Sequence, residues 1–144
     1  MSATATVSDP NRKHLEAART LIAKGDLKQA ALTLNKAQKQ LPNDPRVFML
    51  AGLMAEKSGN INGAFEALRR SVALAPDWGP GLLELALLLA RQNQFKEAVE
   101  TAEKVAALEP RNLQVLAGVV DIAHRAGHTE MAVRHLRRGL ELVP

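Results

Sequence analysis

The sequence predicts an all-α fold of eight helices arranged as four helix-turn-helix repeats. Composition is the first observation that predicts it: 24 of the 144 residues are alanine and 22 are leucine, whereas phenylalanine and tryptophan together number four and tyrosine is absent. Because β-strands favour β-branched and aromatic residues, this composition favours helices. The second observation is a fixed repeat period, marked by a series of four equally spaced prolines: Pro42, Pro76, Pro110 and Pro144.

Two more residue series keep the same period. Alanine recurs once in each period, at Ala30, Ala64, Ala98 and Ala132. Small side chains let two helix backbones approach closely, so we expect these positions where two helices cross. Residues that favour a left-handed turn also recur, at Gly25, Gly59, Asn93 and Gly127. Each period therefore predicts two helices separated by a tight turn.

The first repeat covers residues 11–44. Apolar residues at helical spacing between Leu15 and Ile22 predict its first helix, which Gly25 ends as a left-handed cap. Asp26 is placed to cap the second helix, and that helix ends before Pro42 because proline cannot continue it.

The next three repeats, 45–78, 79–112 and 113–144, follow the same plan. In the second repeat Pro45 opens the first helix, Gly59 ends it and Asn60 caps the second. The third and fourth repeats predict first helices over 80–92 and 113–125, with second helices that end at 108 and 142. Residues 1–10 contain no signal peptide pattern and predict a flexible leader, so we expect a cytoplasmic protein.

A helix-turn-helix unit of about 34 residues, with small residues where its helices cross and with proline at its end, resembles the tetratricopeptide repeat (TPR). The small crossing positions on the first helices are Ala18, Gly52 and Ala86. The resemblance covers 11–144 and implies a right-handed superhelical solenoid whose first helices line a concave groove. In the fourth repeat Val120 replaces the small residue, and Gly139 is expected to give back the space.

Catalysis, a cofactor and a metal are not expected. The sequence has no cysteine, no phosphate-binding glycine loop, and no serine with a histidine placed as its base. His124 and His128 have the i,i+4 spacing of zinc ligands, but Gly127 breaks the helix between them and no third ligand is evident. The acidic residues Glu97, Glu100 and Glu103 indicate a solvated helix face. We therefore do not expect an enzyme within these residues.

A membrane span and nucleic-acid binding are also not expected. The longest apolar run, Leu85–Ala90, is far shorter than the roughly 20 residues of a membrane helix. The net charge is +4, and the last helix carries a basic cluster of Arg134, His135, Arg137 and Arg138. A second basic series repeats once in each unit, at Lys36, Arg70, Lys104 and Arg138. Aromatic stacking partners for bases are missing apart from Trp78, so a solvated basic ridge is the favoured interpretation.

The resemblance places a partner-binding groove on the first helices of the repeats. The residues expected to line it are Leu15, Arg19, Met49, Leu50, Leu53, Leu83, Glu84, Leu87, Asp121 and His124. The segments 47–55 and 82–90 are apolar almost all round, which favours an apolar peptide or helix of another protein as the ligand. The alternative is that neighbouring repeats cover this strip themselves. Three arginines at one end would suit acidic residues that flank the bound segment: Arg12, Arg19 and Arg46.

The family's other ligand-binding patterns are not found here. Where chaperone-tail receptors of the family carry a carboxylate clamp, this sequence has Leu15, Arg19, Leu50, Pro80 and Glu84. Where sugar-transferring relatives carry an asparagine ladder, it has Glu16, Leu50, Glu84 and Gly118. The resemblance therefore implies a protein-interaction scaffold for an apolar segment.

The last helix predicts a second apolar surface. Repeat arrays normally end on a helix with a polar outer face, yet an apolar stripe is expected to lie bare here: Val133, Leu136, Leu140 and Val143. Three explanations are open: the natural protein continues beyond this point, two copies associate through the C-terminal repeat, or the exposure is tolerated. We favour continuation. By analogy with similar bacterial proteins, the alternative function is recognition for a larger enzyme of glycosyltransferase, sulfotransferase or methyltransferase type, with catalysis outside these residues.

Overall fold

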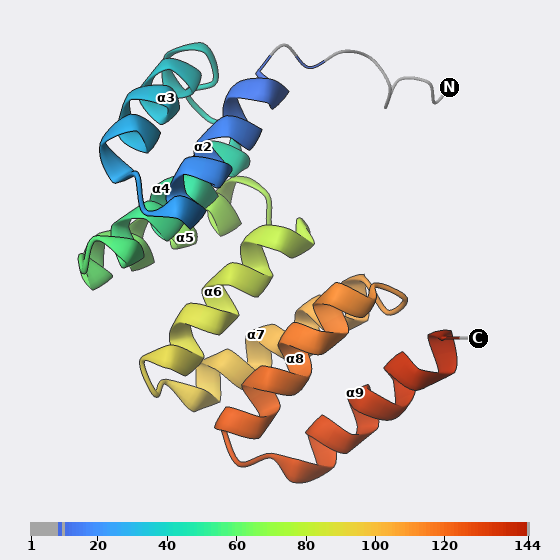
Figure 1. Ribbon diagram of the computed structural model, residues 1–144. Helices are drawn as coiled ribbons and strands as arrows, with labels where there is room; N and C mark the ends of the chain where they lie inside the picture. The colour runs from blue at the N-terminus through green and yellow to red at the C-terminus, as the bar shows by residue number, and fades with distance from the viewer. Residues whose placement is uncertain (1–8, 10, 144) are drawn as a thin grey trace. The chain divides into compact units, whose positions relative to one another are not determined.

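The computed structural model describes residues 9 and 11–143, and every regular element in that part of the chain is an α-helix (Figure 1). The predicted all-α fold of eight helices in sequential antiparallel pairs is confirmed. Apart from Asp9, the predicted leader lies outside the described residues, as does Pro144. The helices are α2 (Arg12–Lys24), α3 (Leu27–Gln40), α4 (Pro45–Lys57), α5 (Ile61–Leu74), α6 (Gly79–Arg91), α7 (Phe95–Leu108), α8 (Leu113–Arg125) and α9 (Thr129–Leu142).

The helix bounds reproduce the period of the proline series. The second helices of the four pairs, α3, α5, α7 and α9, each have 14 residues and begin one period apart. Three of the first helices, α4, α6 and α8, each have 13 residues and also begin one period apart. The first helix of the third repeat, α6, begins at Gly79, one residue before the predicted start of that helix, with Pro80 in the first turn.

The turn inside each hairpin adopts the left-handed conformation that the series of turn residues predicts. The backbone φ is 82° at Gly25, 86° at Gly59, 61° at Asn93 and 75° at Gly127. A residue with a Cβ generally pays about 1–2 kcal/mol in this region, and asparagine is one of the few that enter it routinely. The four turns therefore share one geometry that the period alone locates.

Side-chain caps start the helix that follows two of these turns. The Oδ1 atom of Asp26 accepts a hydrogen bond from the backbone N–H of Gln29 at 3.3 Å, as the sequence predicts. The Oδ1 atom of Asn60 accepts one from the backbone N–H of Gly63 at 2.9 Å. Each cap satisfies an N–H that lacks a partner inside its own helix.

Contacts within the chain define two compact units, 1–67 and 68–144. In the first unit α2 packs on α3, and α4 packs against both of them. In the second unit α6 packs on α7, α8 packs against both α6 and α7, and α9 packs on α8. A helix laid across the preceding hairpin is thus the packing motif of each unit.

Small residues allow this close packing. Ala18, Ala86 and the first three members of the alanine series have no exposed surface, in agreement with their predicted role at helix crossings: Ala30, Ala64 and Ala98. The fourth member, Ala132 on α9, is only half-buried. The exposed surface at Ala132 belongs to the last described helix of the second unit.

Candidate protein-binding site

The ten residues expected to line a groove are divided between the two units. In the first unit the side chains of Leu15, Met49 and Leu50 are 6%, 4% and 3% exposed, so they belong to the core. For these three residues the expectation of a partner contact is corrected. For Met49 and Leu50 the physical reason is that α4 is apolar on nearly every side, and such a helix is normally buried on every side. Leu15 lies on the buried side of α2, which it shares with Ala18 and Ile22. Leu53 is half-buried, and Arg19 is exposed.

In the second unit the predicted residues lie on α6 and α8, which pack against each other. A Cβ atom added to Gly118 on α8 would lie 3.0 Å from a methyl carbon of Leu83, so the Leu83 side chain rests directly on the α8 backbone. Leu83 and Leu87 are half-buried, which leaves part of each leucine in contact with solvent. We call this surface the α6–α8 face, and its residues are Leu83, Glu84 and Leu87 from α6 with Ala117, Asp121 and His124 from α8.

Polar groups border the leucines of the α6–α8 face. Asp121 and His124 are exposed one turn apart on α8, and Glu84 is half-buried on α6. The Nε atom of Arg125 donates to Oδ2 of Asp121 at 3.1 Å, an i,i+4 pair on the surface. Such pairs contribute about 0.3–0.5 kcal/mol, so a competing ligand could displace the arginine at little cost.

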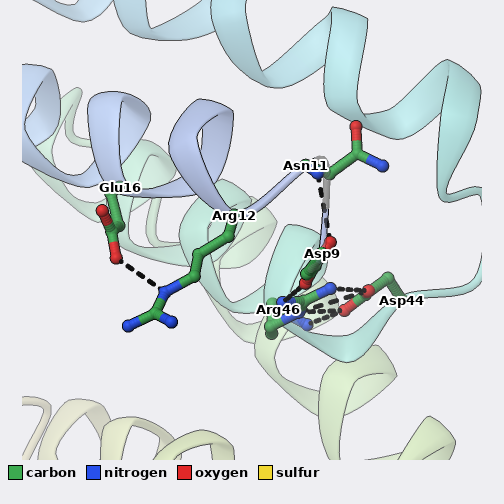
Figure 2. A network of polar contacts seen from close by, with 6 residues as sticks. All are labelled: Asp9, Asn11, Arg12, Glu16, Asp44 and Arg46. Atoms are coloured by element: carbon green, nitrogen blue, oxygen red, sulfur yellow. Dashed lines mark hydrogen bonds and ion pairs between the residues drawn. The ribbon is translucent and has the colours of Figure 1, made fainter. Parts of the chain in front are cut away.

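Arg46, at the start of α4, forms a network of ion pairs with Asp44 and Asp9 (Figure 2). The guanidinium donates from Nη2 to Oδ2 of Asp44 at 2.7 Å and from Nε to Oδ1 of the same carboxylate at 3.0 Å, and Nη1 pairs with Asp9. The hydrogen bonds that Arg46 donates to Asp44 and Asp9 raise its pKa above the ordinary value for arginine. They also hold the carboxyl pKa of both aspartates below the usual range. The prediction that Arg46 receives acidic residues of a partner is therefore wrong, because carboxylates of this chain already accept hydrogen bonds from all three of its side-chain nitrogens.

The same network gives Asp9 a role that the sequence interpretation missed. The backbone N–H of Asn11 donates to Oδ1 of Asp9 at 3.1 Å, and the backbone N–H of Arg12 donates to the carbonyl oxygen of Asp9 at 3.0 Å. Asp9 therefore holds the first turn of α2 and, through Arg46, joins it to the start of α4 (Figure 2). An aspartate just ahead of a helix is a capping signal, and this signal could have separated Asp9 from the leader.

Three members of the basic cluster on α9 are engaged within the second unit. Arg134 donates from Nη2 to Glu103 at 2.9 Å, and Nε2 of the buried His135 lies 2.6 Å from the other oxygen of the same carboxylate. Arg138 donates from Nε to the carbonyl oxygen of Pro110 at 3.2 Å. Partial burial raises the pKa of Glu103, but the hydrogen bonds from Arg134 and His135 outweigh it and leave that pKa below its ordinary value. These side chains tie α9 to α7 and its following turn, which leaves Arg137 as the cluster's remaining cation.

The acidic side chains of α7 are thus more than a solvated helix face. Glu103 binds α9, and Glu97 receives two hydrogen bonds from the guanidinium of Arg69, at 2.7 and 3.1 Å. Each carboxylate links the second helix of one repeat to the second helix of a neighbouring repeat. The expectation of a purely solvated face is therefore corrected for Glu97 and Glu103.

The two histidines with the spacing of zinc ligands, His124 and His128, are separated by a turn. His124 lies in the last turn of α8 and His128 is the N-cap residue of α9, with Gly127 in the left-handed turn between them. Across residues 9 and 11–143, no three side chains of the metal-binding types gather at one point. The helices of the same stretch are too short or too polar for any of them to cross a bilayer.

The fold and these surfaces define an α-helical repeat protein. The tetratricopeptide repeat family model matches residues 15–77 and 83–144, and the chain belongs to this family. Among curated proteins, tetratricopeptide repeat protein 7A of Homo sapiens is 26% identical over 115 residues, which are 80% of this chain and 13% of that protein. A TPR repeat-containing protein of Pseudomonas aeruginosa is 30% identical over 112 residues, 77% of this chain and 19% of the relative. The chain thus spans less than a fifth of the length of either protein.

Solved structures share the fold at low sequence identity. PilF of Pseudomonas aeruginosa superposes with a TM-score of 0.81 at 16% identity, over 92% of this chain and 61% of that one. MamA of Desulfovibrio magneticus superposes with a TM-score of 0.71 at 21% identity, over 97% of this chain and 78% of the other. At these identities the likeness concerns the helical architecture alone.

Proposed function

We propose that this chain is a protein-binding module that holds an apolar peptide or helix of a partner protein on the α6–α8 face. Tetratricopeptide repeat domains are generally protein–protein interaction modules, which supports the class of function. The observation that carries the finer proposal is the partial exposure of two leucines on α6, Leu83 and Leu87, with the Leu83 side chain packed on Gly118 of α8.

The energy available from this face comes from completing the burial of its leucines. Full burial of a leucine contributes about 1.5–3 kcal/mol, and a half-buried leucine retains a fraction of that gain for a ligand. Two such side chains supply enough for a weak interaction, which hydrogen bonds to the peptide would strengthen. The exposed Asp121 and His124 then select among apolar segments by charge and hydrogen bonding. The mechanism is passive and requires neither catalysis nor a cofactor.

The test is a selection of peptides from a random displayed library on the full chain, followed by affinity measurement on two variants. Leu87→Glu places a charge on the α6–α8 face and should weaken the selected peptides at least tenfold. Leu32→Glu is the matched control, because Leu32 is an exposed leucine on α3 in the other unit. Circular dichroism checks that both variants keep their helicity. Equal loss of binding in the two variants, or undiminished binding to Leu87→Glu, would contradict the proposal.

A further inference from the structure

The helices α8 and α9 are the last two helices of the second unit (Figure 1). An apolar hollow lies between them. Its volume is about 330 Å³, and we call it the α8–α9 groove; its lining includes Leu113, Val120, Leu136, Gly139, Leu140 and Val143. The sequence predicts four bare apolar residues in the last repeat, and this is confirmed: Val133, Leu136 and Leu140 on α9 are 39%, 53% and 65% exposed, and Val143 at its C-cap is 53% exposed. Val120 and Gly139, where the glycine is expected to give back space, both line this hollow.

The chain itself shows what covers such a surface. One repeat earlier, the positions that match Leu136 and Leu140 are Ala102 and Ala106 on α7, and both are buried. They lie in a hairpin, α6–α7, and α8 packs against both of its helices. In the first unit α4 packs across α2 and α3 in the same way. The internal repeat therefore indicates that a helix is the element whose shape fits this groove.

The spacing of the exposed residues specifies the occupant further. Val133, Leu136 and Leu140 follow one another on α9 at intervals of three and four residues, and Val143 follows three residues later at the C-cap, where the backbone is extended. This is the a/d spacing of a coiled-coil seam, which takes the apolar side chains of a facing helix between its own. The occupant is therefore an amphipathic helix with apolar residues at the same spacing.

A repeated charged position predicts the charge of the occupant. The residues at this position are Arg69, Glu103 and Arg137, each one period after the last. Arg69 pairs with Glu97 on the next second helix, α7, and Glu103 pairs with Arg134 on the next second helix, α9. Arg137 is exposed beside Leu136, and no carboxylate within 11–143 or at Asp9 forms an ion pair with it. An occupant in register with the repeats would place a carboxylate opposite this guanidinium.

We propose that the α8–α9 groove docks an amphipathic helix of a partner protein whose apolar seam is flanked by a carboxylate facing Arg137. This site differs from the α6–α8 face: the two surfaces share Ala117 on α8, but the groove is lined mainly by the exposed apolar residues of α9 and includes neither Leu83 nor Leu87.

A second copy of the chain suits the groove less well. The residues of α2 that match the buried Val115, Leu116 and Val119 of α8 are exposed and mostly polar: Lys13, His14 and Ala17. The α2 helix of another copy would therefore bring a positive charge and little apolar surface. Two α9 helices in antiparallel pairing would be centred near residue 138, which places the Arg137 side chains of both copies close together. Like charges flanking one seam oppose such a pairing.

The test uses a synthetic helix as the probe and the full chain as the receptor. The probe is a lactam-bridged peptide of about 15 residues, bridged because unconstrained helices of this length are marginal in water. It carries leucine at the a and d positions and glutamate at the flanking positions, and a second probe has lysine in place of each glutamate. Fluorescence anisotropy measures both affinities. The glutamate probe is expected to bind about fivefold more tightly than the lysine probe, the size expected for an ion pair at a half-exposed site.

Variants then assign the binding to the groove. Leu136→Glu should lower the affinity at least tenfold, and Leu32→Glu, a leucine of matched exposure (52%), should leave it unchanged. Gly139→Leu fills the hollow without adding charge and should also prevent docking. Arg137→Glu should reverse the preference, so that the lysine probe binds more tightly. Leu87→Glu should have no effect, which separates this site from the α6–α8 face.

Three results would overturn the proposal. One is equal affinity for the glutamate and lysine probes. Another is binding that survives Leu136→Glu and Gly139→Leu. The third is a dimer in sedimentation equilibrium that Leu136→Glu dissociates, because a second copy would then be the occupant.

Discussion

Replacement of Gly139 by alanine should stabilise α9, although glycine provides space in many helix pairs. Gly139 lies inside the helix, three residues before its end at Leu142, and its φ is outside the left-handed region. A Cβ atom added there would meet only one side chain within 4 Å, a methyl carbon of Leu113 at 3.8 Å, which is ordinary van der Waals contact. The gain is therefore the helix propensity difference between the two residues, about 0.8–1.0 kcal/mol.

Native-state hydrogen exchange is the assay suited to this prediction, because helices of repeat proteins open locally as well as globally. A gain of about 1 kcal/mol slows exchange of the α9 amides about fivefold. Gly63→Ala on α5 is the control: its Cβ would lie 2.5 Å from the Asn60 side chain that caps the helix, so lost capping offsets the propensity gain. Faster exchange of α9 in Gly139→Ala would refute the reasoning, since it would show that the groove side of Gly139 is filled.

Three further predictions concern packing, turns and pH. Ala98→Leu should cost about 1–3 kcal/mol by overpacking a fully buried crossing, whereas Ala132→Leu at the matching half-buried position should cost less in urea denaturation. Asn93→Ala should lower the free energy of unfolding by about 1 kcal/mol, because the φ of 61° at this position disfavours alanine. Asn93→Gly should not lower it, and thermal unfolding followed by circular dichroism distinguishes the two variants. The pKa of Glu103 is lower in the folded state than its ordinary value of 4.5. The stabilisation that Glu103 contributes is therefore complete above pH 4.5 and is lost as the pH falls through the pKa of the folded state. The stability difference between wild type and Glu103→Gln, less than about 1 kcal/mol for this half-exposed pair, should therefore shrink between pH 6 and about pH 3 in urea titrations.

The architecture could be predicted from the sequence because the residues that recur in each repeat determine the structure of the turn or helix end in which they lie. Gly25 and Asn93 set the backbone of their turns, and Asp26 caps the helix that follows, whatever surrounds them. Such effects act within a few residues, so a period in these residues fixes the helix bounds to within about one position. The exposed seam of α9 was also predictable, because apolar spacing on a helix identifies the residues that share one face.

The prediction of groove residues was wrong at positions whose exposure or pairing depends on neighbouring helices. Periodicity places Met49 and Leu50 on an apolar helix, but it does not say which side of that helix remains open after packing. The structure buries both residues. Arg46 was misassigned for a similar reason: the charge is visible in the sequence, but its pairing with Asp9, 37 residues away, arises only when the starts of α2 and α4 come together. Surface function in repeat proteins thus depends on contacts between helices that local signals do not encode.

Hydrogen exchange of the full chain with and without a library-selected peptide tests the central claim most directly. If the chain is a protein-binding module that uses the α6–α8 face, the bound peptide slows exchange in segments covering Leu83–Arg91 and Gln114–Arg125. Segments of α3 (Leu27–Gln40) serve as the internal reference and should exchange at an unchanged rate. Protection confined to α3, or no protection anywhere at saturating peptide, would contradict the claim.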